Sequence, residues 1–292
     1  MSIKIDKKID FKNDEIKNRN QIFPKVDDDL PQLPFIAALI GSSGQGKSTT
    51  CINLLQKYVN QNAFDRIALF SPSSVPDERT GLTADDRFFQ LPITEMYSQY
   101  SDDILEDIIE RQKQEIKIYK DYIQDKKIWD QYLADPTNSE LEIKALDIYN
   151  RTGVIPPECH MKRYPSGLII MDDLGDDTSI KKTGKSKLNN FVCRIRHSLF
   201  SFITNYQNLT QCPSTIRKQI NLYIIFKTQD DKYLKNIYEE VAAGDMRFAT
   251  FKKLFEMLPN RHDFLLINLK SKDAKRKYRI NFDKYLDIND KN

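Results

Sequence analysis

The fold of this chain is decided by residues 35–59, which read FIAALIGSSGQGKSTTCINLLQKYV. They begin with an apolar run over 35–40, which is typical of a buried strand. Residues 41–48 follow at once and satisfy the pattern G-x-x-x-x-G-K-[ST] at every fixed position. Residues 49–59 then carry apolar side chains at helical spacing. A strand, a glycine-rich loop and a helix in this order predict a phosphate-binding loop, whereas a chance glycine–serine turn would lack the flanking elements.

Each residue type in this loop has a role in binding phosphate. Glycines let the backbone wrap closely enough for its N–H groups to point at phosphate oxygens, and the following helix presents its positive end to the same anion. The Lys47 ammonium is expected to reach the β- and γ-phosphates of ATP, and the Ser48 hydroxyl is expected to bind Mg²⁺. The predicted nucleotide-binding residues are Gly41, Ser42, Ser43, Gly44, Gln45, Gly46, Lys47, Ser48 and Thr49.

A second motif lies at residues 168–173, which read LIIMDD. Four apolar residues that end in an acid match a Walker B strand, whose first acid lies at the carboxyl edge of the sheet and holds Mg²⁺. Asp172 is expected to hold the metal, and Asp173 is expected to orient or deprotonate the attacking water. Because aspartate is one methylene shorter than glutamate, which many hydrolysing relatives use, the water must lie closer or the backbone must advance. An ordinary acid at a helix start would produce the same letters, and the glycine-rich loop favours the Walker B interpretation.

Gln207 lies just beyond the strand predicted at residues 201–204. A polar residue at the end of the strand beside Walker B can reach the γ-phosphate, so Gln207 is predicted to report whether ATP or ADP is bound. The alternative is an ordinary glutamine in a surface loop.

A group of arginines includes a candidate arginine finger, a guanidinium that stabilises charge on the γ-phosphate of a neighbouring subunit. Arg196 is the first choice, followed by Arg194 and Arg217. For each of them the alternative is a helix-surface arginine.

Histidines and cysteines indicate no metal site. No pair among the four cysteines has zinc-finger or CxxC spacing, which fits a reducing compartment. His197 is interpreted as a structural hydrogen-bonding residue. His160 and His262 have no partners in the sequence that indicate a site.

The remaining patterns predict an α/β domain with a P-loop core and a mainly parallel sheet, because apolar strands alternate with helices. Apolar residues at helical spacing over 102–149 predict long amphipathic helices in an insertion or lid of about 83–160. Apolar runs at 264–269 and 278–282 predict a C-terminal β-hairpin. The other predicted strands are 67–70, 168–171, 201–204 and 222–226. The predicted domains are an N-terminal arm (1–33), an ATPase domain (34–282) and a C-terminal tail (283–292).

The composition agrees with one large domain, since the chain has 292 residues, of which 40% are hydrophobic. Its formal net charge is only +3, but lysines cluster at 181–187 and basic residues at 270–279. Such clusters suit nucleic-acid backbones, or they simply keep a loop soluble. No signal peptide and no apolar run that could span a bilayer is present, so a soluble, intracellular protein without membrane contact is expected.

Four segments occur in an order that resembles a known family: LPFIAALIGSSGQGKSTT, PSGLIIMDDLGDD, RIRHSLFSFITNYQNLTQCPSTIRKQINLYIIFK and FKKLFEMLPNRHDFLLINL. Together they resemble the poxvirus-type genome-packaging ATPases of giant DNA viruses and virophages, within the FtsK–HerA superfamily of DNA pumps. The resemblance covers most of residues 35–282, and it is weaker over 102–149.

The resemblance implies a RecA-like P-loop core. It also implies an ATP-driven translocase that threads double-stranded DNA through a ring of identical subunits, a pentamer or a hexamer. It also implies packaging of a viral genome into a preformed capsid, in the host-cell cytoplasm or a viral factory. Carried over by residue, Lys47 and Ser48 are the Walker A pair, Asp172 and Asp173 are Walker B, and Gln207 is the sensor.

Three alternatives to this function stay open. A nucleotide or small-molecule kinase also uses the glycine-rich loop, although a second carboxylate and a glutamine fit water activation better. A non-hydrolysing protein with a relic ATP site would not need Lys47, Ser48 and Asp172 together. Another FtsK–HerA-type DNA pump would usually carry membrane or extra DNA-reading domains.

Overall fold

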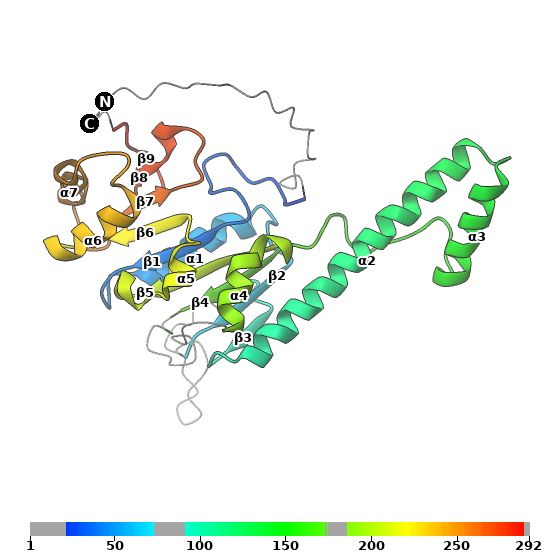
Figure 1. The fold of residues 1–292 in the computed structure, drawn as a ribbon, viewed down its shortest axis with the longest axis horizontal. Helices are drawn as coiled ribbons and strands as arrows, with labels where there is room; N and C mark the ends of the chain where they lie inside the picture. The colour runs from blue at the N-terminus through cyan, green and yellow to red at the C-terminus, as the bar shows by residue number, and fades with distance from the viewer. Residues whose placement is uncertain (1–21, 73–90, 173, 175–185, 289–292) are drawn as a thin grey trace, which may run out of the picture.

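The computed structural model describes residues 22–72, 91–172, 174 and 186–288. Its centre is a nine-stranded sheet in the order β3-β2-β4-β5-β1-β6-β7-β8-β9 (Figure 1). The strands are β1 (Ile36–Ile40), β2 (Arg66–Phe70), β3 (Glu95–Tyr97), β4 (Gly167–Met171), β5 (Phe200–Tyr206), β6 (Leu222–Phe226), β7 (Phe264–Asn268), β8 (Tyr278–Ile280) and β9 (Lys284–Tyr285). Strands β3 to β6 in this order are parallel, and the last three are antiparallel. The predicted α/β class is confirmed.

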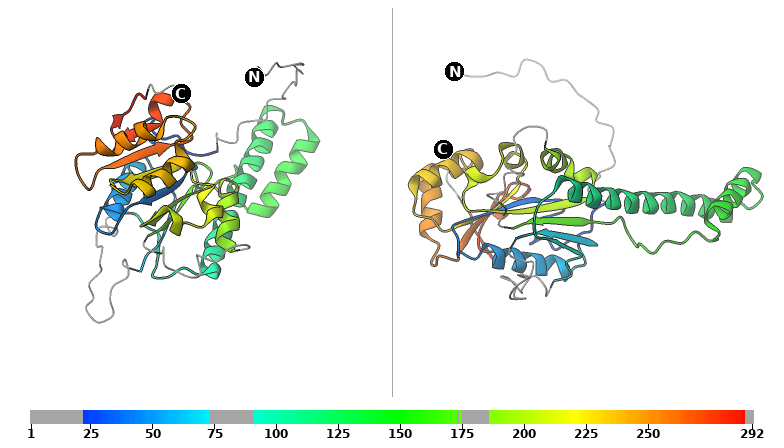
Figure 2. Two further views of the ribbon diagram at one scale, coloured as in Figure 1. Left: turned by 60° about the vertical axis from the view of Figure 1, so that its left-hand side comes forward. Right: turned by 90° about the horizontal axis from the view of Figure 1, so that it is seen from below.

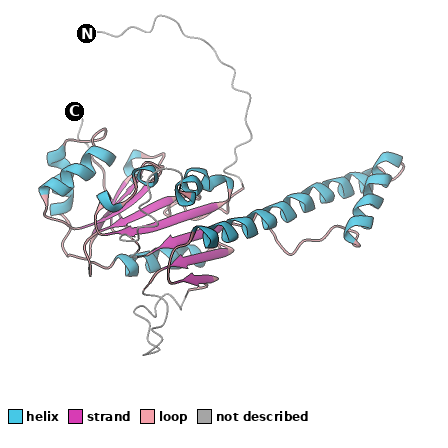
Figure 3. Ribbon diagram, turned by 60° about the horizontal axis from the view of Figure 1, so that its bottom comes forward, coloured by secondary structure: helices cyan, strands magenta, loops and turns pink. Residues whose placement is uncertain are grey.

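Helices cover both faces of this sheet (Figures 2 and 3). The helices are α1 (Lys47–Val59), α2 (Asp102–Ala134), α3 (Ser139–Thr152), α4 (Lys187–Arg194), α5 (Ser214–Arg217), α6 (Asp231–Val241) and α7 (Phe248–Glu256), with 3₁₀ turns η3 (Ile195–His197), η4 (Leu209–Gln211) and η5 (Ala274–Arg276). Side chains alternate along β1: Ala37 and Leu39 face α1, whereas Ile36, Ala38 and Ile40 face α4 to α7. Strands buried on both faces are expected to be continuously apolar, as the central strands of this chain are.

Part of the predicted N-terminal arm packs against its own chain. Phe23, Leu30 and Leu33 are buried in the cluster that surrounds α1, and the Tyr58 hydroxyl donates a hydrogen bond to Pro31 O at 2.7 Å. Residues 22–33 therefore belong to the core of the domain, and residues 1–21 lie outside the described chain.

The helical insertion contains a strand that its sequence pattern did not indicate. β3 is three residues long, half-buried, and pairs with β2 at the edge of the sheet. After it, α2 begins behind the Ser101 N-cap, and its first turns are buried against the sheet through Leu105 and Ile108. The rest of α2 extends beyond the sheet and carries α3 at its far end (Figure 1).

An ion network holds the helical arm, which consists of α2 and α3, on the sheet at its base. Arg66 of β2 contacts Glu95 of β3 at 3.2 Å and Glu115 of α2 at 2.9 Å, and Arg111 contacts Glu95 at 2.7 Å. Arg66 and Glu95 are mostly buried, so their charges neutralise each other where water is scarce. α2 begins beside the carboxyl-terminal ends of the parallel strands and runs back past their amino-terminal ends (Figure 1). The helical arm therefore projects away from the carboxyl-terminal ends. In this structure the helical arm is therefore not a lid over the carboxyl-terminal ends of the strands.

The predicted C-terminal hairpin is present as β7 and β8, and it is longer than expected. β9 pairs with β8 in register Ile280 to Lys284, so the sheet extends into the segment that was predicted as a tail. Within the described ranges, no helix combines the length and the apolar composition that crossing a bilayer would require.

Candidate active site

The glycine-rich loop occupies the turn between β1 and α1, as its pattern predicts. Gly46 immediately precedes α1 with φ = 96°, in the left-handed region that favours glycine. A Cβ atom on Gly41 would lie 2.6 Å from Gln45 Oε1 and 2.8 Å from Phe226 Cβ, so no larger residue fits there without a shift. The loop is therefore built on conformations and close approaches that only glycine provides.

Lys47 folds back over this loop. Its Nζ donates hydrogen bonds to Gly41 O at 2.7 Å and to Ser42 O at 3.1 Å. Gln45 contributes to the same turn, since its Oε1 accepts from Ser42 N at 2.6 Å and its Nε2 donates to Lys227 O at 2.8 Å. The Lys47 ammonium is thus located beside the first two residues of the loop. A phosphate that binds there could replace the two carbonyl oxygens as hydrogen-bond partner of the ammonium.

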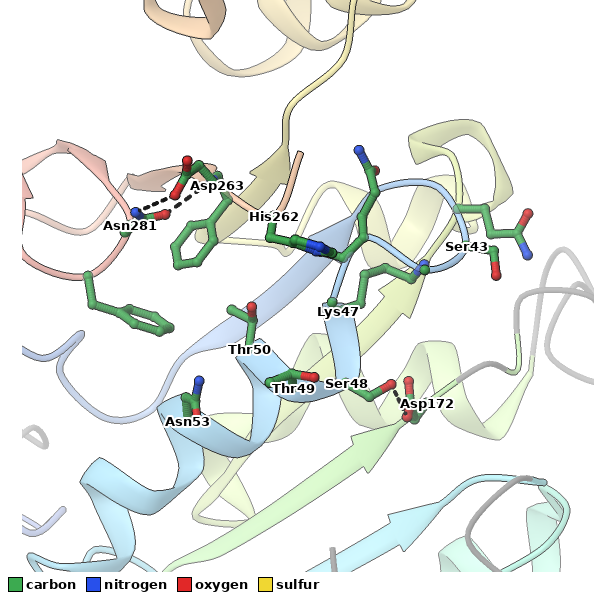
Figure 4. Close-up of a pocket in the computed structure, with 16 residues that line it drawn as sticks. Ser43, Lys47, Ser48, Thr49, Thr50, Asn53, Asp172, His262, Asp263 and Asn281 are labelled. Carbon is green, nitrogen blue, oxygen red and sulfur yellow. Dashed lines mark hydrogen bonds between the residues drawn. The ribbon is translucent and has the colours of Figure 1, made fainter. Parts of the chain in front are cut away.

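The two predicted metal-binding residues are in contact. The Ser48 hydroxyl at the start of α1 donates to Asp172 Oδ2 at 2.9 Å (Figure 4). Asp172 directly follows β4 and is only 3% exposed. A carboxylate and a hydroxyl are hard oxygen donors, which Mg²⁺ prefers, and Mg²⁺ commonly takes few protein ligands beside substrate phosphates. The residues present therefore fit Mg²⁺.

Asn205, near the end of β5, is a site residue that the sequence analysis missed. Its Nδ2 donates to Asp172 Oδ1, so both carboxylate oxygens of Asp172 have partners. Asn205 is 2% exposed, and its own Oδ1 is buried without a hydrogen-bond partner in the described structure. β5 lies between β1 and β4, which brings Asn205 between the two Walker strands. A polar residue within the apolar run FITNY was the signal that could have revealed it.

Gln207 is located where the sequence predicts. It lies just beyond β5 and is exposed. It lines a cavity at the carboxyl-terminal ends of the strands, which Lys47 and Asp172 also line. Its backbone N–H donates to Gln211 Oε1 at 3.0 Å, which fixes the turn that carries it. A γ-phosphate sensor at Gln207 stays a prediction.

None of the candidate finger arginines lines this cavity. Arg194 and Arg196 are exposed at the amino-terminal end of β5, whereas the cavity lies at the carboxyl end. Arg217 forms an ion pair with Glu240, with Nε and Oε1 3.4 Å apart. Each arginine could therefore reach only the cavity of another copy, as the finger prediction assumes, and the choice among them stays open.

Other predicted residues lie outside the described chain. Asp173 is one of them, as are three of the four lysines in 181–187. The fourth, Lys187, opens α4 and contacts Glu106 of α2 at 2.7 Å, an ion pair that joins two helices. Its contact is therefore with this chain's own arm, which does not support the predicted grip on DNA phosphates at this position.

The segment before β7 holds the tip of the glycine-rich loop. Arg261 Nη2 donates to Gly44 O at 2.6 Å, and His262 Nδ1 lies 3.0 Å from Gln45 O (Figure 4 shows His262 beside the loop). Because a carbonyl can only accept, His262 carries the proton on Nδ1 in this contact. Two carbonyl oxygens at the tip of the loop are therefore held by side chains from the segment before β7. His262, which has no partner visible in the sequence, thus belongs to the site.

We expect the Arg261→Gln substitution to raise the KM for ATP about three- to tenfold with a smaller change in kcat, because it loosens a loop that binds substrate without touching the reacting atoms. Steady-state phosphate release measures both parameters. Arg151→Gln is the matched control, since Arg151 is an exposed arginine with one carboxylate partner on the arm. An unchanged KM in Arg261→Gln would contradict the positioning role.

The cavity formed by these elements has a volume of about 780 Å³. Ser48 and Asp172 lie at one end and Asp263 and Asn281 at the other, with Lys47 between them (Figure 4). Its shape is open and its lining is mostly polar, which suits a charged, elongated ligand. The lining residues are Ser43, Gly44, Gln45, Gly46, Lys47, Ser48, Thr49, Thr50, Asn53, Asp172, Gln207, His262, Asp263, Phe264, Asn281 and Phe282.

Comparisons with known proteins give distant similarities. No protein-family model matches the chain. A curated relative, uncharacterized protein 075L of Invertebrate iridescent virus 6, is 27% identical over 115 residues. That alignment spans 39% of this chain and 43% of the viral protein, so less than half of the relative is matched.

Among solved structures, the chain is similar to the genome packaging NTPase B204 from Sulfolobus turreted icosahedral virus 2, in its complex with sulfate. The identity is 15%, the TM-score is 0.49, and the match covers 85% of this chain and 96% of B204. EssC (ATPases 2 and 3) from Geobacillus thermodenitrificans matches with 14% identity and a TM-score of 0.44, over 90% of this chain and 41% of EssC. At such distances the function must be argued from the site's own geometry.

Proposed function

We propose that this chain is an ATP-driven translocase of double-stranded DNA that packages a viral genome into a preformed capsid. The observation that carries the ATPase part is the contact between Ser48 and Asp172, beside a loop whose lysine lies at its mouth. A Walker A hydroxyl and a Walker B carboxylate, 124 residues apart in sequence, meet at the carboxyl edge of a parallel sheet, where such folds bind ligands.

The proposed reaction is in-line attack of water on the γ-phosphate of ATP. Lys47 exchanges its bonds to Gly41 O and Ser42 O for phosphate oxygens and neutralises the charge that develops on them. Mg²⁺, when bound by Ser48 and Asp172, supplies further charge neutralisation. Asn205 holds the Asp172 carboxylate in place by its amide hydrogen bond. We assign the orientation of the water to Asp173 and the detection of the γ-phosphate to Gln207.

The proposed ring, a pentamer or a hexamer, rests on the resemblance to packaging ATPases, and it assigns a role to the arginines. Arg194 and Arg196 lie at the sheet edge opposite the cavity, so a finger can act only on a second copy. The cavity of each copy would then be completed by its neighbour, with Arg196 as the preferred finger. The proposed site of action is the host-cell cytoplasm or a viral factory, where capsids assemble.

The DNA and packaging parts of the proposal are supported by the four sequence segments that resemble packaging ATPases. Exposed basic residues provide sequence-independent contacts to a phosphate backbone. Such exposed residues occur in the turn between β7 and β8, at Lys272, Lys275 and Arg276. Three further lysines belong to the segment 181–185, which lies outside the described residues.

Phosphate release measured with and without double-stranded DNA tests this function against the kinase alternative. The proposal predicts stimulation by DNA of any sequence and no transfer of radiolabelled γ-phosphate to nucleosides or nucleotides. Efficient transfer to such an acceptor, with no response to DNA, would identify a kinase and contradict the proposal.

Replacing Lys181, Lys182 and Lys185 together with alanine is expected to lower the stimulation of ATP hydrolysis by DNA several-fold. Hydrolysis without DNA should stay unchanged. The measurement is the dependence of phosphate release on DNA concentration at two salt concentrations, since phosphate contacts weaken with salt. The control removes three exposed lysines of the arm, Lys117, Lys120 and Lys127. Equal stimulation by DNA in the wild type and in the triple lysine variant would exclude a DNA contact at 181–185.

A further inference from the structure

The end of the cavity far from Asp172 has no role in holding phosphate or metal. It is lined by Phe264, Phe282, Asp263 and Asn281 from the C-terminal strands and by Asn53 of α1. Figure 4 shows Asp263 and Asn281 on the opposite side of Lys47 from Asp172. A nucleotide that lies along the cavity with its phosphates on the loop would bring its base toward this end.

This end has an aromatic floor. Phe282 is half-buried, and its ring lies 5.0 Å from that of Phe264 in an edge-to-face arrangement. Phe264 is only 5% exposed and packs in turn on Phe226, with ring centroids 5.5 Å apart. Phe282 is thus supported from behind and still borders the cavity. An aromatic side chain of this kind offers a surface on which a flat base can stack.

A fixed carboxylate lies beside this floor. Asp263 Oδ2 accepts from Asn260 N at 2.7 Å and Oδ1 accepts from Asn281 Nδ2 at 2.9 Å, while Asn281 Oδ1 accepts from Phe264 N at 3.2 Å. Burial raises the pKa of Asp263, but the hydrogen bonds from Asn281 and Asn260 outweigh it, and the net pKa is lowered. The group is therefore an ionised acceptor, and a carboxylate has lone pairs beyond the two used here.

We infer that Phe282, supported by Phe264, and Asp263 form the subsite that binds the nucleobase of ATP. This inference depends on the proposed function, because it assumes that the triphosphate occupies the glycine-rich loop. Phe282 contacts one face of the base, and Asp263 accepts a hydrogen bond from the amino group.

Equilibrium binding to the full chain tests this subsite, with ATP, purine riboside triphosphate and inorganic tripolyphosphate as competitors against a fluorescent ATP analogue. The wild type is expected to bind ATP at least about tenfold more tightly than tripolyphosphate, which has no base. Phe282→Leu keeps the apolar packing and removes the ring. It is expected to weaken ATP binding about five- to tenfold and to leave tripolyphosphate binding unchanged.

The control is Phe248→Leu, because Phe248 is also half-buried and in edge-to-face contact, with Tyr238, away from the cavity. Purine riboside triphosphate, which lacks the amino group and has no N–H donor on that edge of the base, is expected to bind the wild type more weakly than ATP. Equal binding of these two nucleotides would exclude the role of Asp263. An ATP affinity within twofold of wild type in Phe282→Leu would exclude the aromatic contact.

The Lys47→Ala variant separates failure of the subsite from failure of the proposed function. It should lose affinity for both ATP and tripolyphosphate, since both place phosphates on the loop. If Lys47→Ala binds both as the wild type does, the phosphate site is wrong and the subsite with it. If Lys47→Ala behaves as expected and Phe282→Leu does not, only the nucleobase assignment is wrong.

Discussion

Replacing Lys47 with alanine is expected to lower ATP hydrolysis by about 100-fold or more, because it removes the cation at the mouth of the loop that would meet charge developing on the γ-phosphate. The fold should survive. Lys47 Nζ donates hydrogen bonds to two backbone carbonyls of its own loop, Gly41 O and Ser42 O, and the side chain is located at the surface of the cavity and outside the two hydrophobic clusters. Phosphate release at saturating ATP measures the effect, and thermal unfolding measures the integrity of the fold.

Lys57→Ala is the matched control for this experiment. Lys57 is an exposed lysine in the last turn of the same helix, so its removal changes the net charge equally. The control should hydrolyse ATP at the wild-type rate. Wild-type turnover in Lys47→Ala would mean that the phosphate does not bind at this loop.

The Asp172→Asn substitution is expected to have a similarly large effect, a loss of about 100- to 1,000-fold in turnover. The neutral amide is a poor ligand for Mg²⁺, and only one of its two terminal atoms can accept, whereas both oxygens of Asp172 accept, from Ser48 Oγ and Asn205 Nδ2. The requirement for Mg²⁺ should also rise by at least about tenfold, as measured by titrating the metal at fixed ATP.

Asp125→Asn controls for the loss of a buried carboxylate. Asp125 is 8% exposed and accepts a hydrogen bond from Arg151 at 2.7 Å on the helical arm, far in sequence from both Walker motifs. It should alter stability more than turnover. If Asp172→Asn retained the wild-type dependence on Mg²⁺, Asp172 could not be the residue that holds the metal.

The phosphate and metal parts of the site could be predicted from sequence because their chemistry is local. The segment from residue 35 to 59 holds its strand, loop and helix together, and LIIMD holds the acid at the end of its own strand. Parallel pairing through β5 then brings Ser48 and Asp172 into contact. The burial of every residue of β1 also follows from the apolar run that begins this segment.

The residues that could not be predicted act across long distances in the chain. Arg261 and His262 reach the loop from 217 residues away, and nothing in the spacing RHD indicates which carbonyls they meet. β3 was missed because Glu95–Tyr97 is short and half-buried, so it lacks the apolar run that identified the central strands. The direction of the arm depends on where α2 meets the sheet, through Arg66 and Glu95, which periodicity along α2 alone does not contain.

The most direct test of the central claim is displacement of a DNA third strand from double-stranded DNA, which reports movement of a protein along the duplex. The account predicts displacement by the wild type with ATP and Mg²⁺, and none with a non-hydrolysable ATP analogue or with Lys47→Ala. Displacement that continues without hydrolysis, or DNA-stimulated hydrolysis that never displaces the third strand, would contradict a translocase driven from this site.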